Sequence, residues 1–230
     1  MTAAAGRQDA QSILAIDTAT TRIVVATGSA GGRLDGLTTW TAGYRHGETL
    51  LATIDALVAE RGAGRLPLSA VVVGTGPGAF TGLRVGLATA KGLAHGLGLP
   101  IVGISTAEAL LAGAGDGEGE FVQLLPAGPS DRILVRAGRA PELLLGGLEP
   151  ELGPGERLIA VDLDGRAPAE AVERGERARA NLGATLVRLG ARRLANRAHD
   201  DLAGLVPEYV TLPRGVTGQV GEVSWSRDPR

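Results

Sequence analysis

A strand, a glycine-rich loop and a helix follow one another in Ala70-Val-Val-Val-Gly-Thr-Gly-Pro-Gly-Ala-Phe-Thr-Gly-Leu-Arg-Val-Gly86. The apolar run at 70–74 is typical of a buried strand, and a helical pattern continues from Phe80 to about Leu97. Small residues recur at every fourth position of this helix, so they form one stripe along which another backbone can approach closely. The stripe consists of Gly82, Gly86, Ala90 and Ala94.

Elements on both sides of this stretch predict an α/β fold that opens with an antiparallel meander. Three β-rich runs separated by polar turns come first, at 12–17, 22–27 and 33–40. Apolar residues then fall at helical spacing from Glu48 to about Gly62. After the long helix, a short strand at 100–103 precedes a helix capped by Ser105, with a glutamate three residues later. The order β-β-β-α-β-α-β-α therefore joins a meander to crossover units.

A glycine-rich and acidic break at 113–119 divides the chain into two units. We expect a disordered N-terminus at 1–11, a first unit at 12–114, a second and less regular unit at 119–212, and a flexible tail at 213–230. Strands of the second unit are predicted at 121–125, 133–135, 143–145 and 158–161, followed by one helix from about 169 to 189.

Composition excludes several classes of function. The 230 residues include no cysteine, which rules out disulfides, thiolate metal sites and a cysteine nucleophile. The chain has 23 basic and 25 acidic residues. The resulting formal charge of −2 disfavours unaided binding to nucleic acid. No apolar stretch is long enough to span a membrane and no leader pattern opens the chain, so we expect a cytoplasmic protein with no membrane partner.

Two polar loops are candidates for binding phosphate. The turn at 17–21 offers one carboxylate and three hydroxyls, and the loop at 74–79 lies between a strand and a helix N-terminus. Neither completes a Walker A or dinucleotide motif, and aspartate, threonine and glycine are also ordinary turn residues. We treat them as a possible vestigial nucleotide loop, with Asp17, Thr18, Thr20, Gly76 and Gly78 as its residues. His46, His95 and His199 share no spacing typical of a metal site.

Four motifs carry a resemblance to the TsaB (YeaZ) family: Ile13-Leu-Ala-Ile-Asp-Thr-Ala-Thr20, His46-x-Glu48-x-Leu50, Gly76-Pro-Gly-Ala-Phe-Thr-Gly-Leu-Arg-Val-Gly86 and Ala90-Lys-Gly-Leu-Ala94. The resemblance covers residues 12–112 densely and the rest thinly. It implies the two-lobed fold of actin, sugar kinases and Hsp70 ATPase domains (the ASKHA fold), with a reduced second lobe. It also implies the dimerisation subunit of the bacterial complex that forms threonylcarbamoyladenosine (t6A) at position 37 of tRNA.

In that family context the chemistry belongs to a catalytic paralogue, TsaD, assisted by an ATPase subunit, TsaE. The resemblance implies that the complex uses ATP, that this chain contacts tRNA only through the complex, and that it forms a homodimer when alone. The paralogue binds a metal through two histidines, whose positions correspond here to Thr106 and Leu110. Since leucine has no donor atom, we expect no metal, no cofactor and no catalytic residue in this chain.

Two departures from the family pattern are present. The segment 125–132 lacks the family's aspartate-alanine-arginine run, and Pro207-Glu-Tyr-Val-Thr211 lacks the arginine that usually follows the tyrosine, with Arg214 arriving later. A small-molecule or sugar kinase is the alternative function, for which Val161-Asp-Leu-Asp-Gly165 is a faint second phosphate loop. A metallopeptidase, the third possibility, lacks the histidines that it would need.

The predicted pairing surface combines the two helices of the first unit. Apolar residues of the first helix and the small and apolar residues of the second are expected to meet the partner chain: Leu50, Leu51, Ile54, Leu57, Leu83, Gly86, Leu87 and Ala90. If this surface is free in the single chain, Gly86→Arg or Leu50→Glu leaves a folded monomer. If the stripe instead faces its own sheet, the same substitutions unfold the protein.

Overall fold

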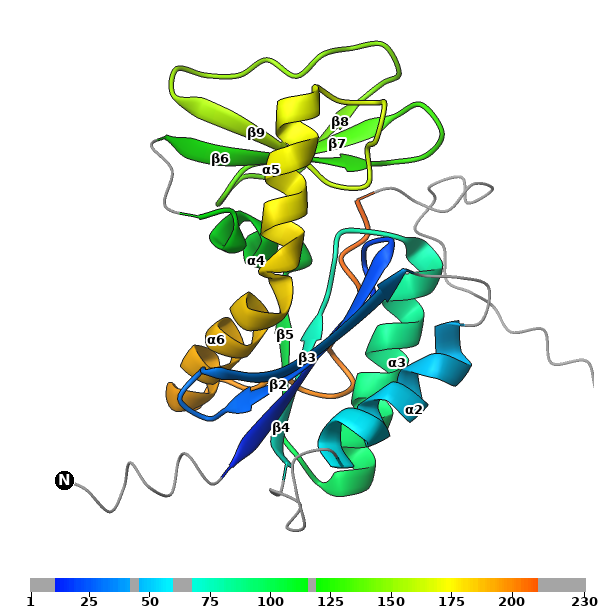
Figure 1. Ribbon diagram of the computed structural model, residues 1–230, viewed down its shortest axis with the longest axis vertical. Coiled ribbons are helices and arrows are strands. Elements are labelled where there is room, and N and C mark those ends of the chain that lie inside the picture. Colours follow the sequence, from blue (N-terminus) through cyan, green and yellow to red (C-terminus); the bar gives the residue numbers. More distant parts are fainter. Residues whose placement is uncertain (1–10, 42–45, 60–67, 116–118, 211–230) are drawn as a thin grey trace, which may run out of the picture.

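The computed structural model describes residues 11–41, 46–59, 68–115 and 119–210, which form two β-sheets with helices packed around and between them (Figure 1). The large sheet has the strand order β3-β2-β1-β4-β5. Its strands are β1 (Ser12–Asp17), β2 (Arg22–Ser29), β3 (Leu34–Thr41), β4 (Leu68–Gly74) and β5 (Ile101–Ile104). Strands β1, β2 and β3 are antiparallel, whereas β1, β4 and β5 are parallel.

Helices cover the large sheet on both faces, which explains why β1 is buried along its whole length. Helices α2 (His46–Ala59) and α3 (Phe80–Leu97) pack on one face, over a core that includes Leu14, Ile16 and Val73. Helix α6 (Leu182–Ala195) packs on the other face, over Ile13, Ala15 and Val72. Figure 1 shows α6 on the opposite side of the sheet from α2 and α3.

The small sheet repeats the topology of the large one. Its strands are β6 (Glu120–Pro126), β7 (Arg132–Val135), β8 (Glu142–Leu144) and β9 (Glu156–Ala160), in the order β8-β7-β6-β9. As in β3-β2-β1-β4, three antiparallel strands are followed by one that pairs in parallel with the first strand of the set. The connection from β8 to β9 contains no helix, whereas α2 lies in the matching connection of the large sheet. The second unit is reduced in this respect.

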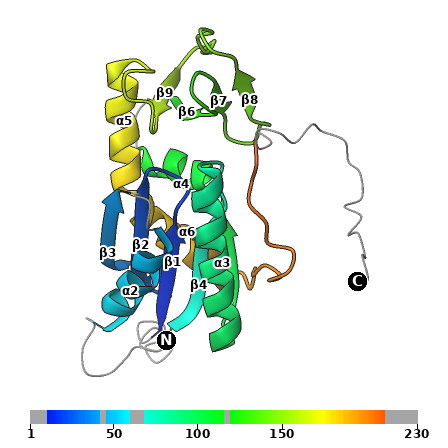
Figure 2. The ribbon, with the colours of Figure 1, turned by 90° about the vertical axis from the view of Figure 1, so that its right-hand side faces the viewer.

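Helix α4 (Thr106–Gly113) lies between the two sheets, and α5 (Ala169–Ala180) covers the small one (Figure 2). The predicted cap of α4 is present, since Ser105 Oγ accepts a hydrogen bond from the amide of Glu108 at 3.4 Å. The single helix expected at 169–189 is wrong, because the chain breaks at Asn181 into α5 and α6. Asn181 Nδ2 donates to the carbonyl of Gly113, which fixes the break against the end of α4.

After α6 the chain returns along the large sheet. Residues 198–210, the C-terminal segment, pass the edge strand β5, where the amide of Asp200 donates to the carbonyl of Ile101 at 2.9 Å. The range 119–212 therefore contributes to both sheets. Residues 1–10 and 211–230, which include most of the expected disordered N-terminus and the whole expected tail, lie outside the described residues. Among the helices that are described, none is both long and apolar enough to cross a bilayer.

Candidate functional site

The two polar loops identified in the sequence meet where the two sheets face each other. The β1–β2 turn and the β4–α3 loop come from the same end of neighbouring parallel strands. The start of α4 and the end of the C-terminal segment join them there. All five residues predicted for a vestigial nucleotide loop are therefore brought together, and we call this region the intersheet site.

Asp17 is the buried centre of the intersheet site. Its Oδ1 accepts a hydrogen bond from the amide of Ala19 at 2.9 Å, and its Oδ2 accepts one from Thr106 Oγ1 at 2.6 Å. Burial raises the pKa of Asp17 to about 6, although the hydrogen bonds from Thr106 and Ala19 oppose this shift. The nearby carboxylate of Asp162 raises the pKa further.

Thr106 and Leu110, at which the resemblance implies the paralogue's metal ligands, are both buried. Thr106 Oγ1 donates to Asp17 and also accepts from the amide of Gly76 at 3.1 Å. Leu110 is fully buried in the apolar core beneath the large sheet. Within the described residues no group of three or more histidine, aspartate or glutamate side chains is arranged to hold a metal ion.

The glycine-rich loop uses its backbone groups for internal contacts. The amide of Ala79 donates to the carbonyl of Ala19 at 2.7 Å, and Thr18 Oγ1 donates to the carbonyl of Gly82 at 2.7 Å. A Cβ at Gly78 would overlap the backbone of Ala19. The glycines therefore let the loop pack closely on the β1–β2 turn, which is their ordinary structural role.

Hydrogen bonds of Thr21 join the β1–β2 turn to an ion pair of the second unit. Asp162, which follows β9, accepts hydrogen bonds from the amide and the hydroxyl of Thr21 at 2.7 and 2.5 Å. Arg179 of α5 donates to Asp162 at 2.6 Å and to Thr21 Oγ1 at 3.1 Å. Asp162 holds this position with a φ of 58°, a conformation that is uncommon outside glycine. The carboxylate expected in a second phosphate loop is thus engaged by protein groups.

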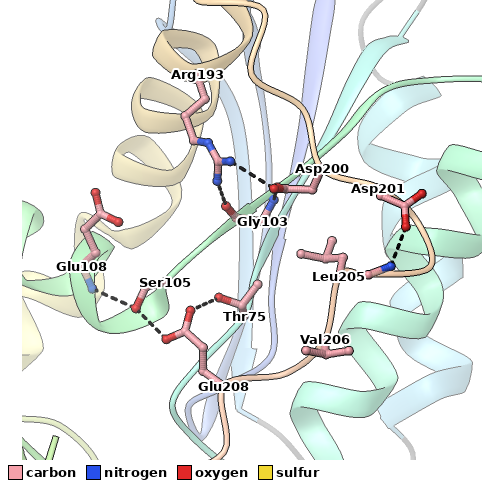
Figure 3. A pocket seen from close by; sticks show the side chains of 11 residues that line it. Thr75, Gly103, Ser105, Glu108, Arg193, Asp200, Asp201, Leu205, Val206 and Glu208 are labelled. Atoms are coloured by element: carbon pink, nitrogen blue, oxygen red, sulfur yellow. Dashed lines mark hydrogen bonds and ion pairs between the residues drawn. The ribbon is translucent and has the colours of Figure 1, made fainter. Parts of the chain in front are cut away.

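The C-terminal segment closes the other side of the site, and the sequence did not reveal this role (Figure 3). Glu208 accepts hydrogen bonds from Thr75 Oγ1 at 2.5 Å and from Ser105 Oγ at 3.1 Å. Asp200 accepts from the amide of Gly103 at 2.7 Å and pairs with Arg193 at 3.1 Å. The only signal was Pro207-Glu-Tyr209, which matches the family ending but does not identify what the glutamate contacts.

An aromatic contact fixes the end of the segment. The ring of Tyr209 lies 5.2 Å from that of Phe80, centre to centre. Arg84 lies over the Phe80 ring at 3.7 Å and donates to the hydroxyl of Tyr209 at 3.0 Å. Phe80 and Arg84 both belong to the stretch that opens α3, so this motif holds the C-terminal segment in place.

Three of the cavities formed by the described residues lie around the site. The one between the glycine-rich loop and the small sheet has a volume of about 400 Å³ and is lined by Thr21, Pro77, Asp162 and Tyr209, among others. The second, of about 520 Å³, lies under the C-terminal segment and is lined by Glu108, Arg193 and Asp201 together with groups already described (Figure 3). The third, of about 690 Å³, lies beside α4 and the small sheet. Glu208 lines both larger cavities and thus lies between them.

The residues predicted for a pairing surface lie mostly inside the chain. Seven of the eight are buried, and only Leu51 is exposed, by 53%. A Cβ at Gly86 would overlap the side chain of Thr18, so the small-residue stripe faces the protein's own β1–β2 turn. Charged substitutions at Leu50 or Gly86 therefore test folding rather than pairing. The pairing surface itself stays a prediction.

Comparison with known proteins places these features in a family. Residues 34–148 match the family model described as "TsaD: tRNA N6-adenosine threonylcarbamoyltransferase". An uncharacterized protein of Mycobacterium leprae is 38% identical over 105 residues, which are 43% of this chain and 28% of that protein. The tRNA threonylcarbamoyladenosine biosynthesis protein TsaB of Escherichia coli is 36% identical over 107 residues, 44% of this chain and 43% of that protein. The chain thus spans less than half the length of either relative.

A solved structure has the same fold as this chain. YeaZ from Pseudomonas aeruginosa superposes with a TM-score of 0.67 over 87% of this chain and 100% of that chain, at 20% sequence identity. At this identity the likeness establishes the fold alone.

Proposed function

The chain belongs to the TsaD family of the matching model, as a TsaB (YeaZ) member, and from this premise we propose that it is a non-catalytic subunit of the machinery that forms t6A in tRNA. In this proposal a TsaD paralogue carries the chemistry, a TsaE subunit hydrolyses ATP, and tRNA is bound by the complex. We also propose a homodimer in the absence of the paralogue, a cytoplasmic location and the two-lobed ASKHA arrangement, with one sheet in each lobe.

The observation that carries the proposal is how Thr106 and Leu110, the two positions implied for metal ligands, are used in this fold. Thr106 is hydrogen-bonded to a buried carboxyl group, and Leu110 lies in the apolar core. A metal ion at this place would need two imidazole ligands that the chain does not supply there, and it would displace packed core atoms. Isolated protein is therefore expected to form no t6A when it is given tRNA, ATP, threonine and bicarbonate.

The alternative of a small-molecule kinase receives no support from the intersheet site. A kinase needs free backbone amides and a carboxylate that can reach phosphate and Mg²⁺. Here the amides of Gly76 and Ala79 and the carboxylate of Asp162 are bound by other protein groups.

We propose that the outward faces of α2 and α3 form the pairing surface. The exposed face of α2 carries Leu51, Ala52 and Ala56, and the exposed face of α3 carries Ala88 and Gly92. Both helices lie on the same face of the large sheet (Figure 1). Small and apolar side chains on exposed helix faces favour close packing against helices of a partner chain.

Co-expression with the TsaD paralogue of the same organism, followed by size-exclusion chromatography, tests both the subunit and its surface. We expect co-elution of the wild-type chain and loss of co-elution for Leu51→Glu and for Gly92→Arg. A Cβ at Gly92 meets no atom within 4 Å, so arginine there leaves the fold intact. Ala195→Arg, at an exposed position on α6, is the matched control and is expected to co-elute.

Three results would count against this proposal. Absence of wild-type co-elution, or t6A formation by the isolated chain, would refute the role of supporting subunit. Normal co-elution of both α2 and α3 variants, with circular dichroism unchanged, would refute the surface alone.

A further inference from the structure

Three arginines on the second half of α6 and just after it are exposed and have no side-chain partner among the described residues. Arg188 and Arg192 lie one turn apart on the outward face of the helix, and Arg197 follows in the next turn of chain. None of the three makes a side-chain hydrogen bond or ion pair in the part of the chain that the structure describes. We call these three residues the α6 basic surface.

Helix α5 provides the contrast within the same molecule. Each of its arginines is paired with an acid: Arg174 with Glu170 at 3.5 Å, and Arg177 with Glu173 at 2.8 Å. Such pairs at i and i+4 are the ordinary way in which a surface helix balances its charge. The remaining arginine of α5 contacts Asp162. Helix α6 has no acidic residue in its sequence, so its exposed charges stay uncompensated.

The groups around the α6 basic surface do not neutralise it. The β2–β3 turn packs against the backbone of Arg188 at Gly32 and adds Arg33, whose guanidinium pairs with Asp35 at 3.1 Å. At the other end, Asp200 is held by Arg193 and by the amide of Gly103. Cations in the last turn of a helix also interact favourably with its dipole. That role does not account for Arg188, which lies in the middle of α6.

The position of the surface leaves the proposed pairing face free. Helix α6 covers the face of the large sheet opposite to α2 and α3 (Figure 1). A partner that binds to α2 and α3 therefore does not cover Arg188 and Arg192. In a complex, this side of the chain remains available to a second, negatively charged partner.

We infer that the α6 basic surface binds the phosphate backbone of the tRNA within the complex; this inference rests on the proposed function. Guanidinium groups match phosphate oxygens in two-point hydrogen bonds, and Arg188 and Arg192 are about 6 Å apart along the helix axis. Contacts to phosphate position a nucleic acid without reading its sequence. With an overall charge of −2, the chain adds this contact to binding surfaces on its partners and does not replace them.

The test measures binding of an unmodified tRNA transcript to the purified complex of this chain and its TsaD paralogue, between 50 and 200 mM salt. Arg188→Gln combined with Arg192→Gln is expected to weaken binding on the order of tenfold and to lower the slope of log K against log salt by about 2. Adding Arg197→Gln is expected to weaken binding further. The matched control, Arg174→Gln with Arg177→Gln, removes the same charge from α5 and is expected to bind as the wild type does.

The outcomes separate this inference from the proposed function. Unchanged tRNA binding by the α6 variant, with the complex intact, overturns the inference and leaves the subunit role standing. Loss of co-elution with the paralogue also overturns it, because the surface is then an interface with an acidic protein. If the wild-type chain does not co-elute, the proposed function fails. The inference rests on the proposed function and is then overturned with it.

Discussion

The carboxyl group of Asp17 is buried and accepts hydrogen bonds from two protein donors instead of from water. Its position at the end of a strand, in a turn rich in hydroxyls, is compatible with a phosphate or magnesium site. In the folded protein, however, the side chain is fully buried and contacts Ala19 and Thr106. The proton on this group therefore affects the stability of the fold.

The contribution of Asp17 to the free energy of unfolding is expected to fall as the pH rises. Burial raises the pKa from 3.8 to about 6 in the folded protein, so the folded state holds the proton more tightly than the unfolded chain. The stabilisation is complete below about pH 4 and is lost as the pH rises through about 6, with a total of about 3 kcal/mol. Asp17→Asn cannot ionise. Its free energy of unfolding, relative to wild type, should therefore rise by up to this amount between pH 4 and pH 8.

Denaturant unfolding at several pH values measures this difference, and taking it relative to wild type cancels the titration of all other groups. Thr106→Val is a second arm, because it removes a hydrogen bond that lowers the pKa of Asp17 and should move the transition to higher pH. Parallel pH profiles for wild type and Asp17→Asn would refute the prediction.

Sequence reasoning named Asp17, Gly76 and Gly78 as parts of one loop site but did not find their partners. The structure brings these residues together because β1 and β4 are parallel neighbours, whose ends meet at the same sheet edge, and a nucleotide role for them stays a prediction. The contacts made by Thr106 and Glu208 depend on segments that are 89 and 133 residues away in the chain. No local pattern encodes which of these distant groups satisfies a given donor.

At the scale of elements, the turn after β1 is hydrogen-bonded through Thr21 to a buried ion pair between Asp162, which follows β9, and Arg179 of helix α5. The side chains of Arg179 and Asp162 are exposed by only 10% and 9%. Removing one partner of a buried pair leaves a charge without compensation, whereas removing both does not. Thr21 contributes the hydrogen bonds that bring the turn into this contact.

Arg179→Met is expected to destabilise the protein by about 3–5 kcal/mol, while the double variant with Asp162→Asn loses less than the sum of the two single variants. A double-mutant cycle in denaturant measures the coupling. The paired but exposed Arg177→Met is the control and is expected to change stability by less than about 1 kcal/mol. Additive losses at Arg179 and Asp162 would mean that the two side chains do not act together.

Strands were easier to predict from sequence than the helices of the second unit. Every strand expected from an apolar run is present, because runs bounded by glycine and proline turns are a local signal. The break at Asn181 was missed, since the helical pattern continues on both sides of it. What ends α5 is the hydrogen bond to Gly113 and the need for α6 to reach the large sheet, and both are tertiary effects.

At the scale of the whole molecule, the core of the first unit is incomplete without helix α6, which follows the second sheet in the chain. One face of the large sheet, which includes Ile13, Val24 and Val72, is covered by α6. A fragment of residues 1–115 lacks this helix and would expose an apolar sheet face to water. The repeated topology of the two sheets therefore does not make them independent folding units.

We expect the fragment 1–115 to show no cooperative unfolding transition by circular dichroism, and we expect a peptide of residues 181–198 to restore one. Burial of each large apolar side chain on the uncovered face contributes about 1.5–3 kcal/mol, which the fragment cannot recover elsewhere. The same peptide with Leu186→Glu is the control, because this leucine is fully buried in the intact protein. A stable fragment would mean that residues 12–114 fold on their own.

The passage of the C-terminal segment beside β5 also protects the protein from its own copies. An uncovered edge strand presents unpaired amides and carbonyls to any extended chain, and this is how strands of separate molecules join into aggregates. Here Asp200 binds the amide of Gly103, and Arg193 binds its carbonyl at 2.5 Å, so both groups of that residue are occupied by side chains. Proteolysis ahead of Asp200 would thus do more than shorten the protein: it would turn a closed edge into a template for self-assembly.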